Sequence, residues 1–144
     1  MKRISIIFLL AFFLNLVWEN LHSFLYDNYM GGVITEFILM RASLFDAILI
    51  TLILLLFLHF SLMKNKSWLI IIVATVVAIF NEWYGLGTGR WAYNLWMPIL
   101  PIIDIGLTPA IQLGLLGWVT YKLQDYIFSR NFTLRDIFSE NHND

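Results

Sequence analysis

Four hydrophobic stretches constrain the fold of this chain more than any other feature. They cover residues 4–23, 43–62, 68–87 and 102–121. A helix of about 20 residues is about 30 Å long, which matches the hydrocarbon core of a bilayer. Because 60% of the 144 residues are hydrophobic and only 13% are charged, a soluble domain of this size would leave much apolar surface in water. The sequence therefore predicts an all-α, polytopic membrane protein, one bundle of four transmembrane helices in the cell membrane.

The basic residues predict the orientation of this bundle. Seven of the nine fall on one side of the predicted spans: Lys2, Arg3, Lys64, Lys66, Lys122, Arg130 and Arg135. The positive-inside rule then places both termini in the cytoplasm, with residues 122–144 as a cytoplasmic or interfacial tail. The first stretch begins like a signal peptide, but no small-residue cleavage pattern follows it. We interpret it as a retained first helix.

Four acidic residues mark the candidate site. Glu19, Asp46, Glu82 and Asp104 each lie near the outer end of a different predicted span. An ionisable group inside a bilayer costs roughly 2.5–3.5 kcal/mol on insertion scales, so such residues normally face the bundle interior or a water-filled cavity. We therefore expect the four acids to converge in one pocket on the extracytoplasmic side.

Helical spacing adds neighbours to this acid layer. His22 lies one turn after Glu19, and the polar residues of the fourth span recur every four positions. Four negative charges in one pocket need arginine or histidine partners, a bound cation, or protonation of one or more acids. Glu82 and Glu19 are the candidate acid and base, Asp46 and Asp104 would orient them, and His22 would exchange protons with them. The candidate binding residues are Asn20, Arg41, Asn81, Trp83, Arg90, Trp91, Tyr93, Thr108 and Gln112.

Simpler explanations exist for the same residues. Acids within a turn of the interface can anchor helix ends, and the aromatic residues match an interfacial belt. Glu19 and His22 have the Glu-x-x-His spacing of dimetal bundles, but those use the motif twice and it occurs once here. No metal or cofactor is predicted. The absence of cysteine and the net charge of −1 give no support to thiolate chemistry or nucleic-acid binding.

The loop after Glu82 resembles a known family. Glu82 is followed by Gly85, then Thr88-Gly89, then Tyr93, roughly the pattern E-x-x-G-x-x-T-G-x-x-x-Y. Over about residues 82–112 the chain is similar to integral-membrane carotenoid hydratases and lycopene cyclases. The resemblance implies isoprenoid chemistry by protonation of a double bond, with Glu82 as the acid. The paired acids after a proline that mark the cyclases are absent.

The fourth span also predicts how helices meet. Gly106, Ala110 and Gly114 form a small-residue ridge that lets another helix approach closely, and a homo-oligomer through this face is one candidate assembly. Pro109 predicts a kink beside Asp104. Three functions remain open: an acid–base enzyme on an isoprenoid or other membrane lipid, a protein that binds or transports a cation or small molecule, and an accessory membrane subunit.

Overall fold

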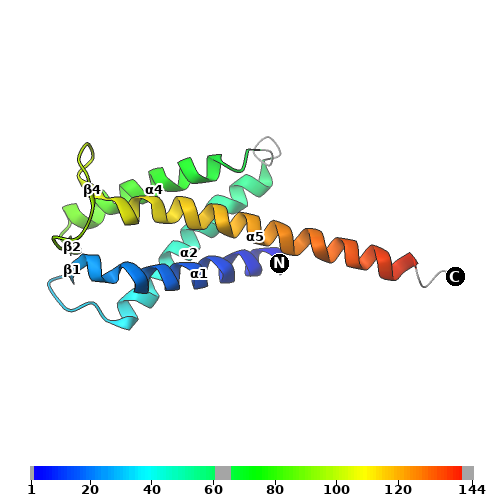
Figure 1. Ribbon diagram of the computed structural model, residues 1–144, viewed down its shortest axis with the longest axis horizontal. Helices are drawn as coiled ribbons and strands as arrows, with labels where there is room; N and C mark the ends of the chain where they lie inside the picture. Colours follow the sequence, from blue (N-terminus) through cyan, green and yellow to red (C-terminus); the bar gives the residue numbers. More distant parts are fainter. Residues whose placement is uncertain (1, 61–65, 141–144) are drawn as a thin grey trace.

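Four α-helices form most of the protein. The computed structural model describes residues 2–60 and 66–140, with side chains described as far as Ser129. The helices of this part are α1 (Lys2–His22), α2 (Glu36–His59), α4 (Leu69–Gly87) and α5 (Leu107–Glu140), and a short 3₁₀ turn, η1 (Ser23–Leu25), follows α1. Figure 1 shows them as an elongated bundle, with α5 projecting past the other helices toward the C-terminus. Lys64 and the rest of 61–65 lie outside the described residues.

The helices are apolar on their outer faces as well as inside. α1, α2 and α4 are each long and apolar enough to cross a membrane. The interior contains small and branched residues such as Ala11, Ile50 and Ala74, whereas Phe13 and Leu56 are exposed. A soluble helix would carry charged residues on its outer face. This arrangement supports the prediction of a membrane protein.

Two helices start at a different residue than the sequence predicts. α2 begins at Glu36, seven residues before the predicted start at 43, and α5 begins at Leu107, five residues after the predicted start at 102. Pro109 explains the second difference. Proline is tolerated in the first turn of a helix, where its missing N–H has no partner, and is costly further in. Pro109 therefore lies in the first turn of α5, and the predicted mid-helix kink was wrong.

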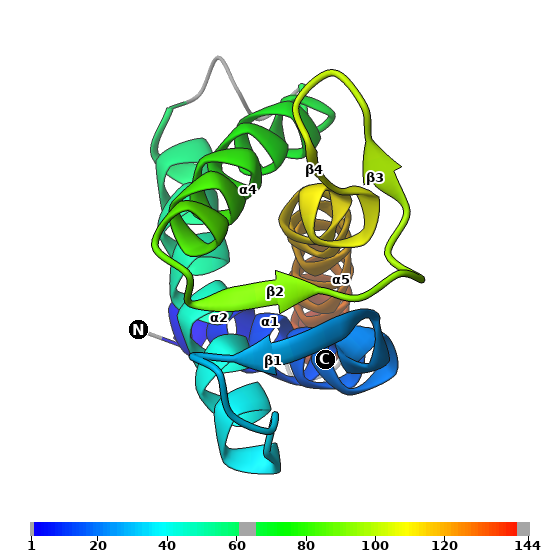
Figure 2. The same cartoon turned by 90° about the vertical axis from the view of Figure 1, so that its left-hand side faces the viewer.

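The prediction of an all-α protein was incomplete, because two small sheets cover one end of the bundle. β1 (Tyr26–Tyr29) pairs antiparallel with β2 (Trp91–Tyr93), and β3 (Ile99–Leu100) pairs antiparallel with β4 (Ile105–Gly106). We call this the sheet end. Figure 2 looks onto it and shows β1 and β2 lying side by side across the ends of the helices. The two loops that the sequence placed outside the membrane are thus joined to each other.

The small-residue ridge of α5 lies against α4. A Cβ atom at Gly114 would be 2.4 Å from the Thr75 side-chain oxygen and 2.8 Å from the Ile71 carbonyl oxygen. Ala110 is buried as well. Gly106 lies outside the helix, in β4. Gly114 is therefore a contact within the chain, and a homo-oligomer through the face of Gly106, Ala110 and Gly114 stays a prediction.

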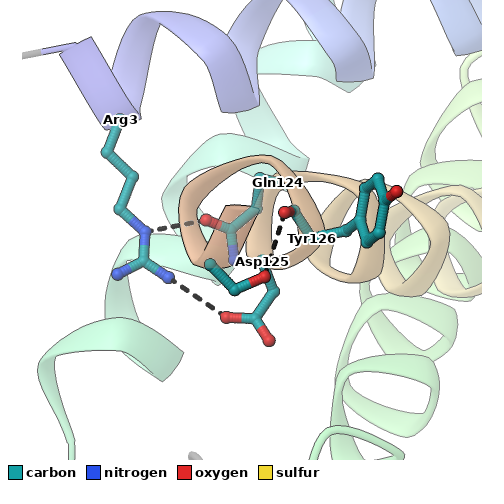
Figure 3. Close-up of polar contacts among 5 residues, drawn as sticks. Arg3, Gln124, Asp125 and Tyr126 are labelled. Carbon is teal, nitrogen blue, oxygen red and sulfur yellow. Dashed lines mark hydrogen bonds and ion pairs between the residues drawn. The ribbon is translucent and has the colours of Figure 1, made fainter. Parts of the chain in front are cut away.

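Polar contacts join α1 to α5 at the end of the bundle opposite the sheet end. The Arg3 Nε group donates a hydrogen bond to Gln124 Oε1 at 2.7 Å, and Arg3 Nη2 is 3.8 Å from Asp125 Oδ1. Figure 3 shows the Arg3 side chain reaching from α1 to both residues of α5. The predicted tail is no separate element, since residues 122–140 continue α5.

The four helices pack chiefly as two pairs. α2 packs chiefly on α1, and α4 packs chiefly on α5. In Figure 1, α2 is tilted relative to the other helices, so that its first turns and the last turns of α4 lie far apart at the sheet end. The functional site lies between these two helix ends.

Candidate functional site

Three of the four predicted acids line one cavity at the sheet end. It has a volume of about 690 Å³, within the range of small-molecule sites. Glu19 comes from α1, Asp46 from α2 and Glu82 from α4. Asp46 is 8% exposed and Glu82 is 5% exposed. The convergence predicted from helical phase is therefore present for these three residues.

Asp104 is the exception. It lies in the turn between β3 and β4, is exposed, and has a backbone φ of 53°. Aspartate tolerates this left-handed conformation better than most residues do, because its short side chain can bond locally. Asp104 does not line the cavity. Its prediction as a fourth inward acid depended on a helix starting at 102 and was wrong.

Gln112 of α5 is the centre of the polar network. Its Nε2 group is 2.7 Å from Glu19 Oε1, 2.9 Å from Asp46 Oδ2 and 3.0 Å from Asn15 Oδ1. An amide nitrogen has two hydrogens, so it donates fully to two of these three acceptors at a time. Asn15 is itself fixed, because its Nδ2 group donates to the Ala11 carbonyl oxygen at 2.8 Å. One amide thus holds groups from α1 and α2 against α5.

Glu19 and Asp46 form a carboxyl pair. Their oxygens lie 2.7 Å and 2.9 Å from the same Gln112 nitrogen, so the two carboxyl groups are close neighbours. Two buried carboxylates so close together repel each other and can only accept hydrogen bonds, whereas a protonated carboxyl group can donate one to its neighbour. This arrangement favours a proton on one member of the pair, at the wall of the cavity.

Glu82 is held by the loop that follows it. The Trp91 Nε1 group donates to Glu82 Oε2 at 3.2 Å, and the Tyr93 hydroxyl donates to the same oxygen. Tyr93 also accepts the Gly106 N–H at 3.0 Å, which joins β2 to β4. Burial, and then the negative charge of Glu82, raises the pKa of Tyr93. Tyr93 therefore remains a donor to Glu82 throughout the physiological pH range.

A glycine at position 85 leaves room for the Trp91 ring beside Glu82. A Cβ atom at Gly85 would lie 1.8 Å from Cζ2 of the Trp91 ring, so any larger residue would collide with the indole. The glycine lets Trp91 pack closely against the last turn of α4, with its N–H toward Glu82. Trp91 lines the cavity, whereas Tyr93 does not line it and contacts two lining residues, Glu82 and Tyr26.

His22 is buried beside the cavity without lining it. Its Nδ1 atom is 2.7 Å from the Trp18 carbonyl oxygen, which can only accept, so Nδ1 carries a proton. The His22 ring contacts the Tyr26 ring edge to face at 5.4 Å, and Tyr26 contacts Tyr93 at the same centroid distance. His22 and Glu19 interact electrostatically. His22 can thus influence the carboxyl pair from outside the cavity.

The two arginines predicted for the outer side both line the cavity. Arg41 Nη2 donates to the Tyr29 hydroxyl at 2.5 Å, and its guanidinium lies 5.4 Å from the centre of that ring. Arg90 Nη2 donates to the Tyr84 hydroxyl at 3.0 Å, and its guanidinium lies 4.9 Å from the ring centre. Both arginines are exposed, so they lie at the rim of the cavity.

The remaining predicted binding residues divide into two groups. Asn81 lines the cavity. Asn20, Trp83 and Thr108 do not, because each side chain is directed elsewhere. Asn20 donates to the Leu16 carbonyl oxygen, Trp83 donates to the Ile103 carbonyl oxygen, and Thr108 contacts the Met97 sulfur. Asn20 and Trp83 were predicted as neighbours of Glu19 and Glu82 in the sequence, and Thr108 as part of the polar ridge with Gln112. Their contacts direct all three side chains away from the cavity.

Several lining residues were missed as site residues. Tyr26 lines the cavity, and burial, followed by the charge of Glu82, raises its pKa. The available signal was the spacing of polar residues at Asn15, Glu19 and His22 of α1, which continues to Tyr26 four residues later, at the start of β1. Tyr29 and Tyr84 were recognisable only once β1 and β2 were paired.

The remaining wall of the cavity is apolar and incompletely closed. Ile38, Leu39 and Ala42 of α2 face Ala78 of α4 and Leu113 of α5 across it. Phe45 of α2 and Tyr84 of α4 also line it, yet they are 49% and 53% exposed. The cavity is therefore accessible from outside between α2 and α4, at the depth of the apolar outer face.

Neither metal ligation nor known relatives identify the site. Among the side chains of residues 2–60 and 66–129, no three His, Asp or Glu residues lie close enough together to hold a metal ion. Comparisons of the chain with protein families, with curated proteins and with solved structures found no match.

Proposed function

We propose that the protein spans the cell membrane four times, with both termini in the cytoplasm and the sheet end outside. α1, α2 and α4 are apolar enough to cross, and the first half of α5 packs along α1 and α4 at the same level. The basic residues support the orientation, since Lys2, Arg3, Lys66 and Lys122 lie at the end opposite the sheets.

We further propose that it is an acid–base enzyme acting on a lipid taken from the membrane, with an unsaturated, isoprenoid-like chain as the reacting group. One observation carries this proposal: the Glu19 and Asp46 carboxyl groups share the Gln112 donor at the wall of an apolar cavity that is accessible between α2 and α4, an arrangement that favours a proton on one of them. A gap between two membrane helices faces lipid, so an apolar substrate could reach the pair without entering water.

The proposed reaction is a proton transfer that balances within the site. The protonated member of the Glu19–Asp46 pair gives its proton to one carbon of a double bond, leaving a carboxylate and a carbocation. A carboxylate of the same pair then removes a proton from a neighbouring carbon, which moves the double bond or closes a ring. Substrate and product have the same atoms, and the pair regains its proton.

The surrounding residues suit this chemistry. The Trp91 ring lines the cavity and could steady a carbocation, since cation–π contacts are worth about 0.5–2 kcal/mol. Gln112 orients the pair through its shared donor. Glu82, which the family resemblance implies as the acid, already accepts two hydrogen bonds. We therefore assign proton transfer to Glu19 and Asp46, and charge stabilisation to Glu82.

The opposite half of the bundle favours an enzyme over a transporter. Beyond Asn15, the interior is mainly apolar, with Ile7, Ala11, Ile50 and Leu54 fully buried, and its buried polar residues, Thr51, Thr120 and Gln124, are uncharged. Ionisable groups usually mark an ion pathway through a membrane protein. The cavity instead ends at the Gln112 network.

The test is mass spectrometry of the lipids that co-purify with the full chain. We expect wild type to retain a specific unsaturated lipid or its isomer, and Asp46→Asn to retain the unreacted form alone. Asp125→Asn, at the opposite end of the bundle, is the matched control and should behave as wild type. Glu82→Gln should retain the lipid with slower conversion. If wild type and all variants carry the same bulk lipids in the same proportions, the enzyme proposal is wrong.

A further inference from the structure

The rim of the cavity carries two positive charges that no acid neutralises. Arg41 and Arg90 both line the cavity. Within the described part of the chain neither contacts a carboxylate, and the ion pair found there joins Arg3 to Asp125 at the other end. The acids of the cavity are engaged elsewhere, Glu82 by the loop and the carboxyl pair by Gln112.

The two arginines are held on the same side of the cavity by the sheet end. Tyr29, on which Arg41 lies, is the β1 partner of Trp91, the residue after Arg90. The Met30 N–H also donates to the Arg90 carbonyl oxygen at 2.6 Å. Each guanidinium has five N–H donors, and the tyrosine hydroxyl uses one of them. The remaining donors of two guanidinium groups are therefore free to bind an anion.

We propose that the cavity binds an amphiphile whose anionic head, a phosphate or carboxylate, contacts Arg41 and Arg90 while its chain lies along the apolar wall. Guanidinium groups bind these anions through paired, charge-assisted hydrogen bonds. The wall below the rim, formed by Ile38, Ala42 and Phe45, provides an apolar surface for the chain. A chain longer than the cavity would extend between α2 and α4 into the bilayer.

The charged residues that line the cavity favour an amphiphile with its head at the rim and its chain inside. Arg41 and Arg90 lie at the exposed rim, whereas Glu19, Asp46 and Glu82 are more buried. An anionic head is attracted to the rim and repelled by the interior, so the chain enters first. The inference rests on the proposed function and adds to it: the double bond that reacts would lie at a fixed distance from a charged head.

The experiment compares two probes that share a chain and differ in head charge, oleoyl lysophosphatidate and monooleoylglycerol. Each is titrated into the full-length protein in detergent, and bound lipid is measured by native mass spectrometry. Wild type should bind the anionic probe about tenfold or more tightly than the neutral probe, because charge-assisted hydrogen bonds contribute strongly in a partly desolvated site. Arg41→Gln and Arg90→Gln should each reduce this preference, and the double variant should abolish it. Arg3→Gln, which removes a positive charge from the opposite end, should keep it.

Equal binding of the two probes by wild type would overturn the inference, as would an equal loss in Arg3→Gln. The wild-type comparison decides the matter even if the double variant fails to fold. Conversion of lipids separates this inference from the proposed function. A protein that prefers the anionic probe but converts no lipid contradicts the proposed function alone, and one that converts a neutral lipid without head preference contradicts this inference alone.

Discussion

Replacing Gln112 by leucine should destabilise the protein more than any other single glutamine substitution on α5. Gln112 is 4% exposed, and its Nε2 group serves three acceptors on α1 and α2. With two hydrogens it makes two full bonds at a time. A hydrogen bond between neutral groups contributes about 0.5–1.5 kcal/mol to stability, and one to a charged group contributes about 1.5–3 kcal/mol. The substitution should therefore lower the free energy of unfolding by about 2–4 kcal/mol. Leucine has a similar volume, so this loss reflects the missing donor and not a cavity.

Gln124 offers a matched control on the same helix. It is fully buried, but among the described residues its amide nitrogen has no hydrogen-bond partner, and its oxygen accepts a hydrogen bond from Arg3. Gln124→Leu should therefore cost about 1 kcal/mol or less. Wild type and both variants are titrated with SDS in mixed micelles while circular dichroism monitors the helix content. The titrations give the change in unfolding free energy that each variant causes. Equal losses in the two variants would refute the argument that Gln112 organises the three helices.

Three further predictions concern the loop and the helix contacts. Gly85→Ala should displace the Trp91 indole and destabilise the fold by about 1–3 kcal/mol with a shift in tryptophan emission, whereas Gly87→Ala, where a Cβ would meet nothing within 4 Å, should do neither. Gly114→Val should separate α5 from α4 and lower the thermal midpoint in detergent; an unchanged midpoint would contradict the close contact. Because the pKa of Tyr93 is raised, the folded protein keeps the Tyr93 proton above about pH 10, whereas the unfolded chain loses this proton there. The free energy of unfolding therefore falls as the pH rises past about 10. Tyr93→Phe should therefore lose less stability than wild type between about pH 9 and pH 11 in denaturant titrations.

The sequence predicted the helices and most of the site for one physical reason. Hydrophobic length and the cost of buried charge act locally, so a span and its inward acid can be recognised without knowing the neighbours. Glu19, Asp46 and Glu82 were found in this way. Gln112 was found as part of a polar ridge, although its role as a shared donor required the packed structure.

The failures arose where tertiary contacts decide local structure. Asp104 was placed on a helix because residues 102–106 are mainly apolar, yet β3–β4 pairing and the position of Pro109 begin the helix later. The ridge at Ala110 and Gly114 was correctly interpreted as a helix contact, but the sequence could not say that α4 already occupies it. The pairing of β1 with β2 joins segments more than sixty residues apart, and no local pattern predicts it.

Deuterium incorporation is the most direct test of the central claim, that the Glu19–Asp46 pair transfers a proton to a lipid chain. Membranes containing wild type, Asp46→Asn or the control Asp125→Asn would be incubated in D₂O, and the extracted lipids analysed by mass spectrometry for deuterium bound to carbon. The account predicts deuterium in one class of unsaturated lipid with wild type and with the control, and none with Asp46→Asn. No carbon-bound deuterium with wild type, or the same amount with Asp46→Asn, would contradict it.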